Sequence, residues 1–93
     1  MKDILNFIQI DKNLATAGQP TKQQFKQIAK KGYEVVINLS MNKKGILKEE
    51  DKIVMRNGMI YYHIPITWQK PELERLELFL ETLKMLQKQK KKI

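Results

Sequence analysis

The chain has 93 residues, which is room for one small domain spanning residues 1–93. Hydrophobic residues make up 42% of it, enough for a buried core, and it contains no cysteine and a single histidine. These residues therefore hold no disulfide, no thiol nucleophile and no cluster of metal ligands, and we expect neither a metal nor a cofactor. There is no apolar run of about 18 residues and no signal-peptide pattern, so a cytoplasmic location without membrane contact is expected.

The net charge of +8 is concentrated at one end of the chain. Without the five lysines of the last ten residues, 13 basic and 10 acidic residues remain. Such an end can bind nucleic acid or an anionic surface, but no aromatic residues are interleaved with the lysines to stack on bases. We favour a helix end that complements its own dipole, and we keep weak binding to an anionic polymer as the alternative. The five are Lys84, Lys88, Lys90, Lys91 and Lys92.

The first third of the chain predicts a hairpin followed by a helix. Residues 7–10 form a short apolar, β-branched run, residues 11–13 supply turn chemistry, and residues 14–18 form the second arm. Thr21 opens the helix, and Gln24 three residues later completes a capping box.

Two strands flank a short helix in the middle of the chain. Residues 33–39 are a continuous β-branched run, typical of a strand covered on both faces. A polar loop follows over residues 40–45, and residues 48–56 predict a helix with acidic residues in its first turn. Residues 59–64 predict another strand, closed by a proline.

The last element is an amphipathic helix that starts near Pro71 and carries a stripe of leucines at positions 73, 76, 80 and 83. The order of elements is therefore β-β-α-β-α-β-α, which predicts an α/β fold with a mostly parallel sheet. Residues 90–93 are typical of the approach to a further strand.

Ligands of open α/β sheets bind beyond the carboxyl ends of the strands. Residues 18–20, 40–42 and 65–69 arrive at that rim. The candidate substrate-binding residues are Gly18, Gln19, Ser40, Thr67 and Trp68.

Each candidate also has a purely structural interpretation. Residues 18–20 can be the turn into the helix cap, Ser40 can end its strand, and Trp68 can cover the end of the core. His63 is expected to be a core histidine rather than a general base. From the residues alone, no catalytic constellation can be assigned.

Residues 14–21, 32–39 and 62–66 resemble a bacterial phosphatase-like family related to dual-specificity protein tyrosine phosphatases, also labelled beta-lactamase-hydrolase-like or sulfur-transferase-like. The resemblance runs from about Asn6 to Lys92. It implies an incomplete protein tyrosine phosphatase-like domain, because members continue into a strand and a His-Cys loop closed by an arginine. The cysteine thiolate of that loop attacks phosphorus or sulfur. The resemblance therefore implies a phosphorylated or other anionic substrate, and it predicts that residues 1–93 are inactive alone.

Related phosphatases carry an aspartate general acid in the loop that corresponds to residues 66–70, and this chain has no acid there. The alternative to a truncated enzyme is a non-catalytic binding or scaffold module. Its sheet would be completed by a partner or by self-association through unpaired strands.

Overall fold

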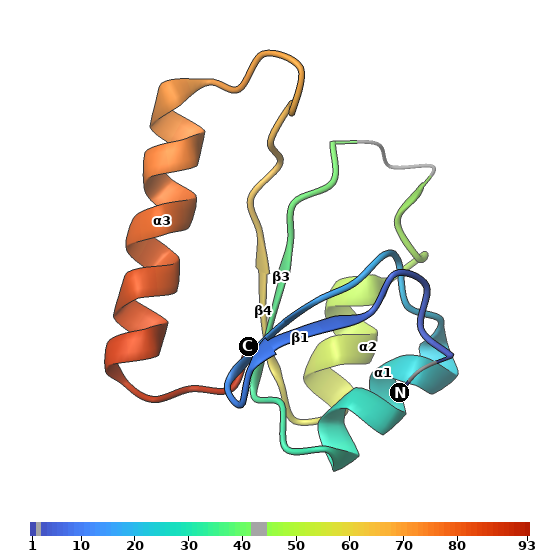
Figure 1. Cartoon of the computed structure of the whole chain (residues 1–93). Coiled ribbons are helices and arrows are strands. Elements are labelled where there is room, and N and C mark those ends of the chain that lie inside the picture. The colour runs from blue at the N-terminus through green and yellow to red at the C-terminus, as the bar shows by residue number, and fades with distance from the viewer. Residues whose placement is uncertain (2, 42–44) are drawn as a thin grey trace.

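The computed structural model describes residues 1, 3–41 and 45–93. Its elements follow the chain order that the sequence predicts, and the fold is α/β. The elements are β1 (Ile8–Asp11), β2 (Leu14–Thr16), α1 (Lys22–Lys30), β3 (Val35–Asn38), α2 (Glu50–Arg56), β4 (Ile60–His63) and α3 (Leu73–Lys88). Figure 1 shows α3 on one side of β3 and β4, with α1 and α2 on the other.

The strands form two pairs, of which β3 and β4 are parallel and β1 and β2 are antiparallel. The expectation of a mostly parallel sheet is therefore wrong. Only Lys12 and Asn13 lie between β1 and β2, and so short a connection can join only antiparallel strands. The amide of Asn13 donates to Asp11 Oδ1 at 2.7 Å and closes this turn.

Two apolar clusters form the core. The first consists of Phe25, Tyr33, Ile53, Val54 and Met59, and it joins α1 and α2 to the β3–β4 pair. The second consists of Val35, Leu86 and Ile93, and it joins α3 to β3. Since Val35 and Val36 belong to different clusters, β3 is covered on both faces, as its β-branched sequence predicts.

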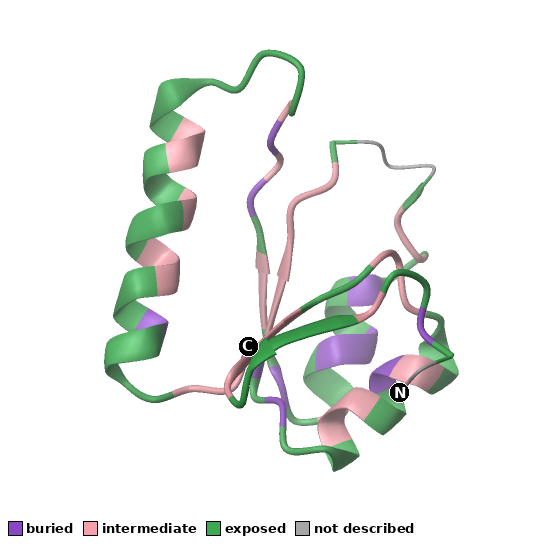
Figure 2. Ribbon diagram, viewed as in Figure 1, coloured by how far each residue is buried: buried purple, intermediate pink, exposed green. Residues whose placement is uncertain are grey.

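The leucine stripe of α3 is only partly used. Leu86 is buried and Leu83 is half-buried, whereas Leu73 is 68% exposed and Leu80 is 53% exposed. The face turned toward the strands is set by Leu86, which packs on Val35, and Leu73 and Leu80 lie on the flank away from it. Figure 2 shows the outer face of α3 as exposed along its length. No helix in the described part of the chain is long and apolar enough to cross a membrane.

The last two residues lie between β2 and β3 and bond to both sides. The amide of Ile93 donates to Asn13 O at 2.8 Å, and the carbonyl of Ile93 accepts from Ala15 N at 3.0 Å. The carbonyl of Lys92 accepts from Val35 N at 3.2 Å. These bonds join the hairpin to the parallel pair, and in Figure 1 the C-terminus lies where the two meet.

The capping box of α1 is present as predicted and gives a first test. Thr21 Oγ1 accepts from Gln24 N at 3.2 Å, and Gln24 Oε1 accepts from Thr21 N at 2.9 Å. We expect Thr21→Ala to lower the free energy of unfolding in urea by about 1 kcal/mol, because a helix N–H loses its acceptor. Gln23→Ala, on the exposed side of the same helix, is the control and should change it by less than about 0.5 kcal/mol. Equal effects of the two changes would contradict a stabilising role for the cap.

Candidate functional site

A cavity of about 1130 Å³ lies along β2 and β3 and reaches the carboxyl ends of the strands. All five residues proposed from the sequence line it, namely Gly18, Gln19, Ser40, Thr67 and Trp68. The structure thus brings the three predicted rim segments together, although Asn42 of the second segment lies outside the described residues. That these five bind a substrate stays a prediction.

The walls of the cavity are mainly apolar and come from every layer of the fold. They include Leu14, Ala15, Phe25, Ile28, Val35, Ile37, Phe79, Leu83 and Ile93. The polar candidate residues Gln19, Ser40 and Thr67 lie at the end of the cavity near the carboxyl ends of the strands. The cavity therefore combines an apolar channel with a polar mouth. This is the usual composition of a ligand pocket in an α/β domain.

Glu50 is the one buried charged residue of the described chain, with 3% of its surface exposed. Its Oε1 accepts a hydrogen bond from Gln19 Nε2, and its Oε2 accepts from Asn38 Nδ2 and from Tyr61 Oη. A carboxylate removed from water needs such donors, because desolvating an unpaired charge is costly. The three donors come from the loop after β2, the end of β3 and strand β4.

The sequence interpretation missed this residue, since it placed Glu50 only among the acidic residues in the first turn of a predicted helix. A signal was nevertheless present. Glu50 lies three and four residues before Ile53 and Val54, which are the buried residues of α2, so all three share one helical face. Glu49 and Asp51 do not share this face and are exposed.

The Glu50 network positions two of the candidate site residues. Gln19 bonds Glu50 and also donates from Nε2 to Pro20 O at 3.0 Å, which holds the loop after β2. Asn38 donates to Glu50 while its Oδ1 accepts from Ser40 N at 2.8 Å. The buried carboxylate therefore orients the loops that carry Gln19 and Ser40 at the mouth of the cavity.

His63 also contacts this loop, and its expected place in the core is wrong. It is the last residue of β4, its side chain is exposed, and its Nε2 lies 2.8 Å from Ser40 O. Tyr61 lies on the same face of β4 and packs against the first core cluster, so His63 is exposed because it ends the strand and not because of the alternation.

Burial raises the pKa of the Tyr61 hydroxyl well above its ordinary value, and the Glu50 carboxylate raises it further. A phenolate beside a buried carboxylate would be repelled, so Tyr61 keeps its proton and its hydroxyl donates a hydrogen bond to Glu50. The Tyr61 hydroxyl therefore acts as a fixed hydrogen-bond donor to Glu50.

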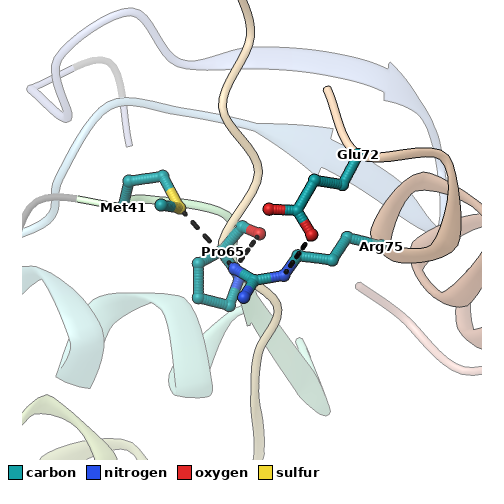
Figure 3. A network of polar contacts seen from close by, with 4 residues as sticks. All are labelled: Met41, Pro65, Glu72 and Arg75. Atoms are coloured by element: carbon teal, nitrogen blue, oxygen red, sulfur yellow. Dashed lines mark hydrogen bonds and ion pairs between the residues drawn. The ribbon is translucent and has the colours of Figure 1, made fainter. Parts of the chain in front are cut away.

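Arg75 ties the start of α3 to the strand ends, as Figure 3 shows. Its Nη1 donates to Pro65 O at 3.1 Å and lies 3.8 Å from Met41 Sδ, and its Nε lies 3.7 Å from Glu72 Oε2. Both the loop after β3 and the loop after β4 are thereby held near the first turn of α3. Glu72, at the N-cap position of the helix, is used in this ion pair.

Gly18 and Trp68 differ in how tightly they are held. The amide of Gly18 donates to Leu5 O at 2.7 Å, and a Cβ there would lie 3.2 Å from three atoms of Leu5, so a larger residue would push Leu5 back slightly. Trp68 is 61% exposed and therefore does not cover the end of the core, which was its structural interpretation. Its ring is left available at the rim.

Two of the C-terminal lysines contact other residues of the same chain. Lys91 Nζ lies 3.4 Å from Glu34 Oε2, and Lys92 Nζ donates to Lys31 O at 2.7 Å. Lys92 Nζ also lies 4.4 Å from the centre of the Tyr33 ring. These contacts favour a structural role for this end. Among residues 1, 3–41 and 45–93, no three His, Asp or Glu side chains are grouped so as to hold a metal ion.

The fold is similar to those of crystal structures provisionally named as phosphatases. Two structures of a DUF442 protein so named, from Shewanella putrefaciens CN-32, match with a TM-score of 0.83 and 34% identity over 90% of this chain. This chain spans 54% of one and 56% of the other. A protein of the same provisional name from Neisseria meningitidis matches in fold, with a TM-score of 0.67 and 20% identity over 82% of this chain and 57% of its own. No family model and no curated protein matches the chain. A phosphatase-like fold is thus supported.

The buried carboxylate provides a second test. In Glu50→Gln an NH2 group replaces one carboxylate oxygen and faces hydrogen-bond donors instead of accepting from them. We therefore expect the free energy of unfolding, measured in urea, to fall by about 2–3 kcal/mol. Glu49→Gln is the matched control, because Glu49 is exposed and pairs only with Lys52 at 3.7 Å. If both variants lose the same small amount, the network does not stabilise the fold.

The raised pKa of Tyr61 predicts a loss of stability in alkali. A raised folded-state pKa gives stabilisation that is complete below the ordinary value of about 10 and is lost as the pH rises above it. We expect Tyr61→Phe to be less stable than the wild type at pH 8 and to lose less stability than the wild type between pH 8 and pH 11, in urea unfolding. Tyr62→Phe is the control, because it keeps the bond between Tyr61 and Glu50. An equal alkaline loss in wild type and Tyr61→Phe would contradict this account.

Proposed function

We propose that residues 1–93 are the substrate-facing front part of a phosphatase-like domain related to the dual-specificity protein tyrosine phosphatases. The complete domain would hydrolyse a phosphoester, or transfer sulfur, through a cysteine thiolate supplied by a segment outside these residues. The observation that carries the proposal is the cavity at the carboxyl ends of β3 and β4, lined by all five candidate residues in a phosphatase-like fold.

The five residues divide the work of holding a substrate. The side chains of Ser40 and Thr67 flank the polar mouth and can hydrogen-bond an anionic oxygen or a bridging ester oxygen, whereas Gln19 shapes the mouth through its bonds to Glu50 and Pro20. The exposed Trp68 ring offers an apolar surface for the organic part of the ester. Glu50 is a positioning residue, since it acts through Gln19 and Asn38.

The proposed reaction has two steps. The thiolate attacks phosphorus and forms a sulfur–phosphorus bond while the ester oxygen departs with the electron pair of the bond that breaks. Water then attacks phosphorus, phosphate leaves, and the thiolate is regenerated. Residues 66–70 contain no acid to protonate the leaving oxygen, so the site favours esters of acidic alcohols, with aryl phosphates turned over faster than alkyl phosphates.

A hybrid protein tests this proposal. Residues 1–93 are followed by the segment that comes after the matched region in the Shewanella putrefaciens protein, and p-nitrophenyl phosphate is the substrate. We expect vanadate-sensitive turnover that is abolished when each cysteine of the added segment is replaced by serine. Gln19→Ala should lower kcat/KM by about tenfold, because a positioning contact is lost. Gln23→Ala, outside the cavity, should leave it unchanged.

Two results would overturn the proposal. One is a hybrid that unfolds cooperatively, like the active Shewanella putrefaciens protein assayed beside it, yet turns over no aryl phosphate. The other is vanadate-sensitive turnover by residues 1–93 alone, because these residues contain no thiol.

A further inference from the structure

We propose that α1 and α2 form a binding site for one phosphate group, either free or at the end of a small organic molecule. The site is a second pocket of about 200 Å³, which we call the basic pocket, where the two helices pack against each other (Figure 1). It shares no lining residue with the larger cavity, so the inference goes beyond the proposed function and does not depend on it. The lining residues are Lys22, Gln23, Lys26, Ile53, Arg56 and Asn57.

Three cationic side chains surround the basic pocket without a carboxylate partner. Within the described residues, Lys22, Lys26 and Arg56 make no ion pair and no side-chain hydrogen bond. Helix α1 contains no acidic residue, and Glu49, just before α2, pairs with Lys52 instead. Three like charges at one pocket repel one another, and a bound anion would remove this repulsion.

The position of Lys22 is unusual for a lysine. It is the first residue of α1, where the helix dipole favours a negative charge and disfavours a cation. Arg56, by contrast, is in the last turn of α2, where the dipole favours a cation. An anion bound between the two helices would neutralise Lys22 and would be held by Arg56.

The core fixes the two helices relative to each other. Ile53 of α2 and Phe25 of α1 are buried in the same apolar cluster. Asn57 Nδ2 donates to Ile53 O at 2.9 Å, which holds the end of α2 where Arg56 leaves the helix. The backbone positions that carry the three cations are therefore set before any ligand binds, which lowers the entropic cost of binding.

The size and the charge of the basic pocket favour a phosphate group as the ligand. Its volume is below the roughly 300–1,000 Å³ of pockets that enclose a whole organic ligand, so it fits a single charged group. A phosphate monoester carries about two negative charges at neutral pH, which three cations can balance. The planar guanidinium of Arg56 can donate two parallel hydrogen bonds to phosphate oxygens, and the two lysine ammonium groups act as point charges.

A nucleic-acid backbone fits the basic pocket less well. Lys30, one turn after Lys26, is exposed but does not line the pocket. The cations therefore converge on one place instead of following a row of phosphates. No aromatic residue lines the pocket to stack on a base.

An NMR titration of residues 1–93 tests the site, with inorganic phosphate and glycerol phosphate as probes and chloride keeping the ionic strength constant. We expect saturable shifts of the Lys22, Lys26 and Arg56 amides with both probes. Dimethyl phosphate, which carries a single charge, should bind at least about tenfold more weakly. Equal affinity for the two probes would identify free phosphate as a sufficient ligand. Tighter binding of glycerol phosphate would identify an organic phosphate.

Variants separate the basic pocket from the general positive charge of the chain. Arg56→Gln should raise the Kd for phosphate by about tenfold, because charge-assisted hydrogen bonds are lost. Arg56→Lys should raise it less, since the charge remains. Lys30→Gln is the matched control, because it removes one positive charge from the same helix outside the pocket. It should change the Kd by less than about twofold.

Four results would overturn the proposal. They are an absence of saturable shifts at the pocket, equal weakening by Lys30→Gln and Arg56→Gln, dimethyl phosphate binding as tightly as phosphate, and pocket shifts caused by duplex DNA but not by phosphate. The last result would assign this surface to a polymer. These readouts need no cysteine and no turnover, so they are independent of the phosphatase assay.

Discussion

Four backbone hydrogen bonds made by Lys92 and Ile93 join two strand pairs that share no ladder elsewhere in the described chain. A two-stranded pair is marginal in water by itself, because too little of its apolar face is covered. The bridge also buries Ile93 against Val35 and Leu86, which fixes α3 on the strands. Both the hairpin and α3 therefore depend on one short segment for their place in the fold.

At the opposite end of the strands, hydrogen bonds between side chains connect the loop after β2 with β3. The Glu50 carboxylate gathers donors from Gln19, Asn38 and Tyr61, and so connects the loop after β2 with the end of β3. Between this network and the bridge at Ile93 the edges of β2 and β3 line an open cavity. The fold is thus joined at both ends of the strands and leaves a channel between them.

Local sequence signals were sufficient for the elements and for the rim of the site. The capping box at Thr21 and the β-branched run at β3 are local features, and both appear in the structure. The five rim residues could be chosen because strand order determines where loops meet. The Glu50 network could not be chosen this way, since it depends on which face of a short helix is buried.

The errors have the same origin in long-range geometry. The hairpin of β1 and β2 was predicted from its short turn and is present, but the strands as a set were still expected to be mostly parallel, and only β3 and β4 are. His63 occupies the last position of its strand, so its side chain turns outward although its neighbours in sequence are apolar. In α3, Leu86 rather than Leu73 determines the buried face because only the C-terminal half meets Val35.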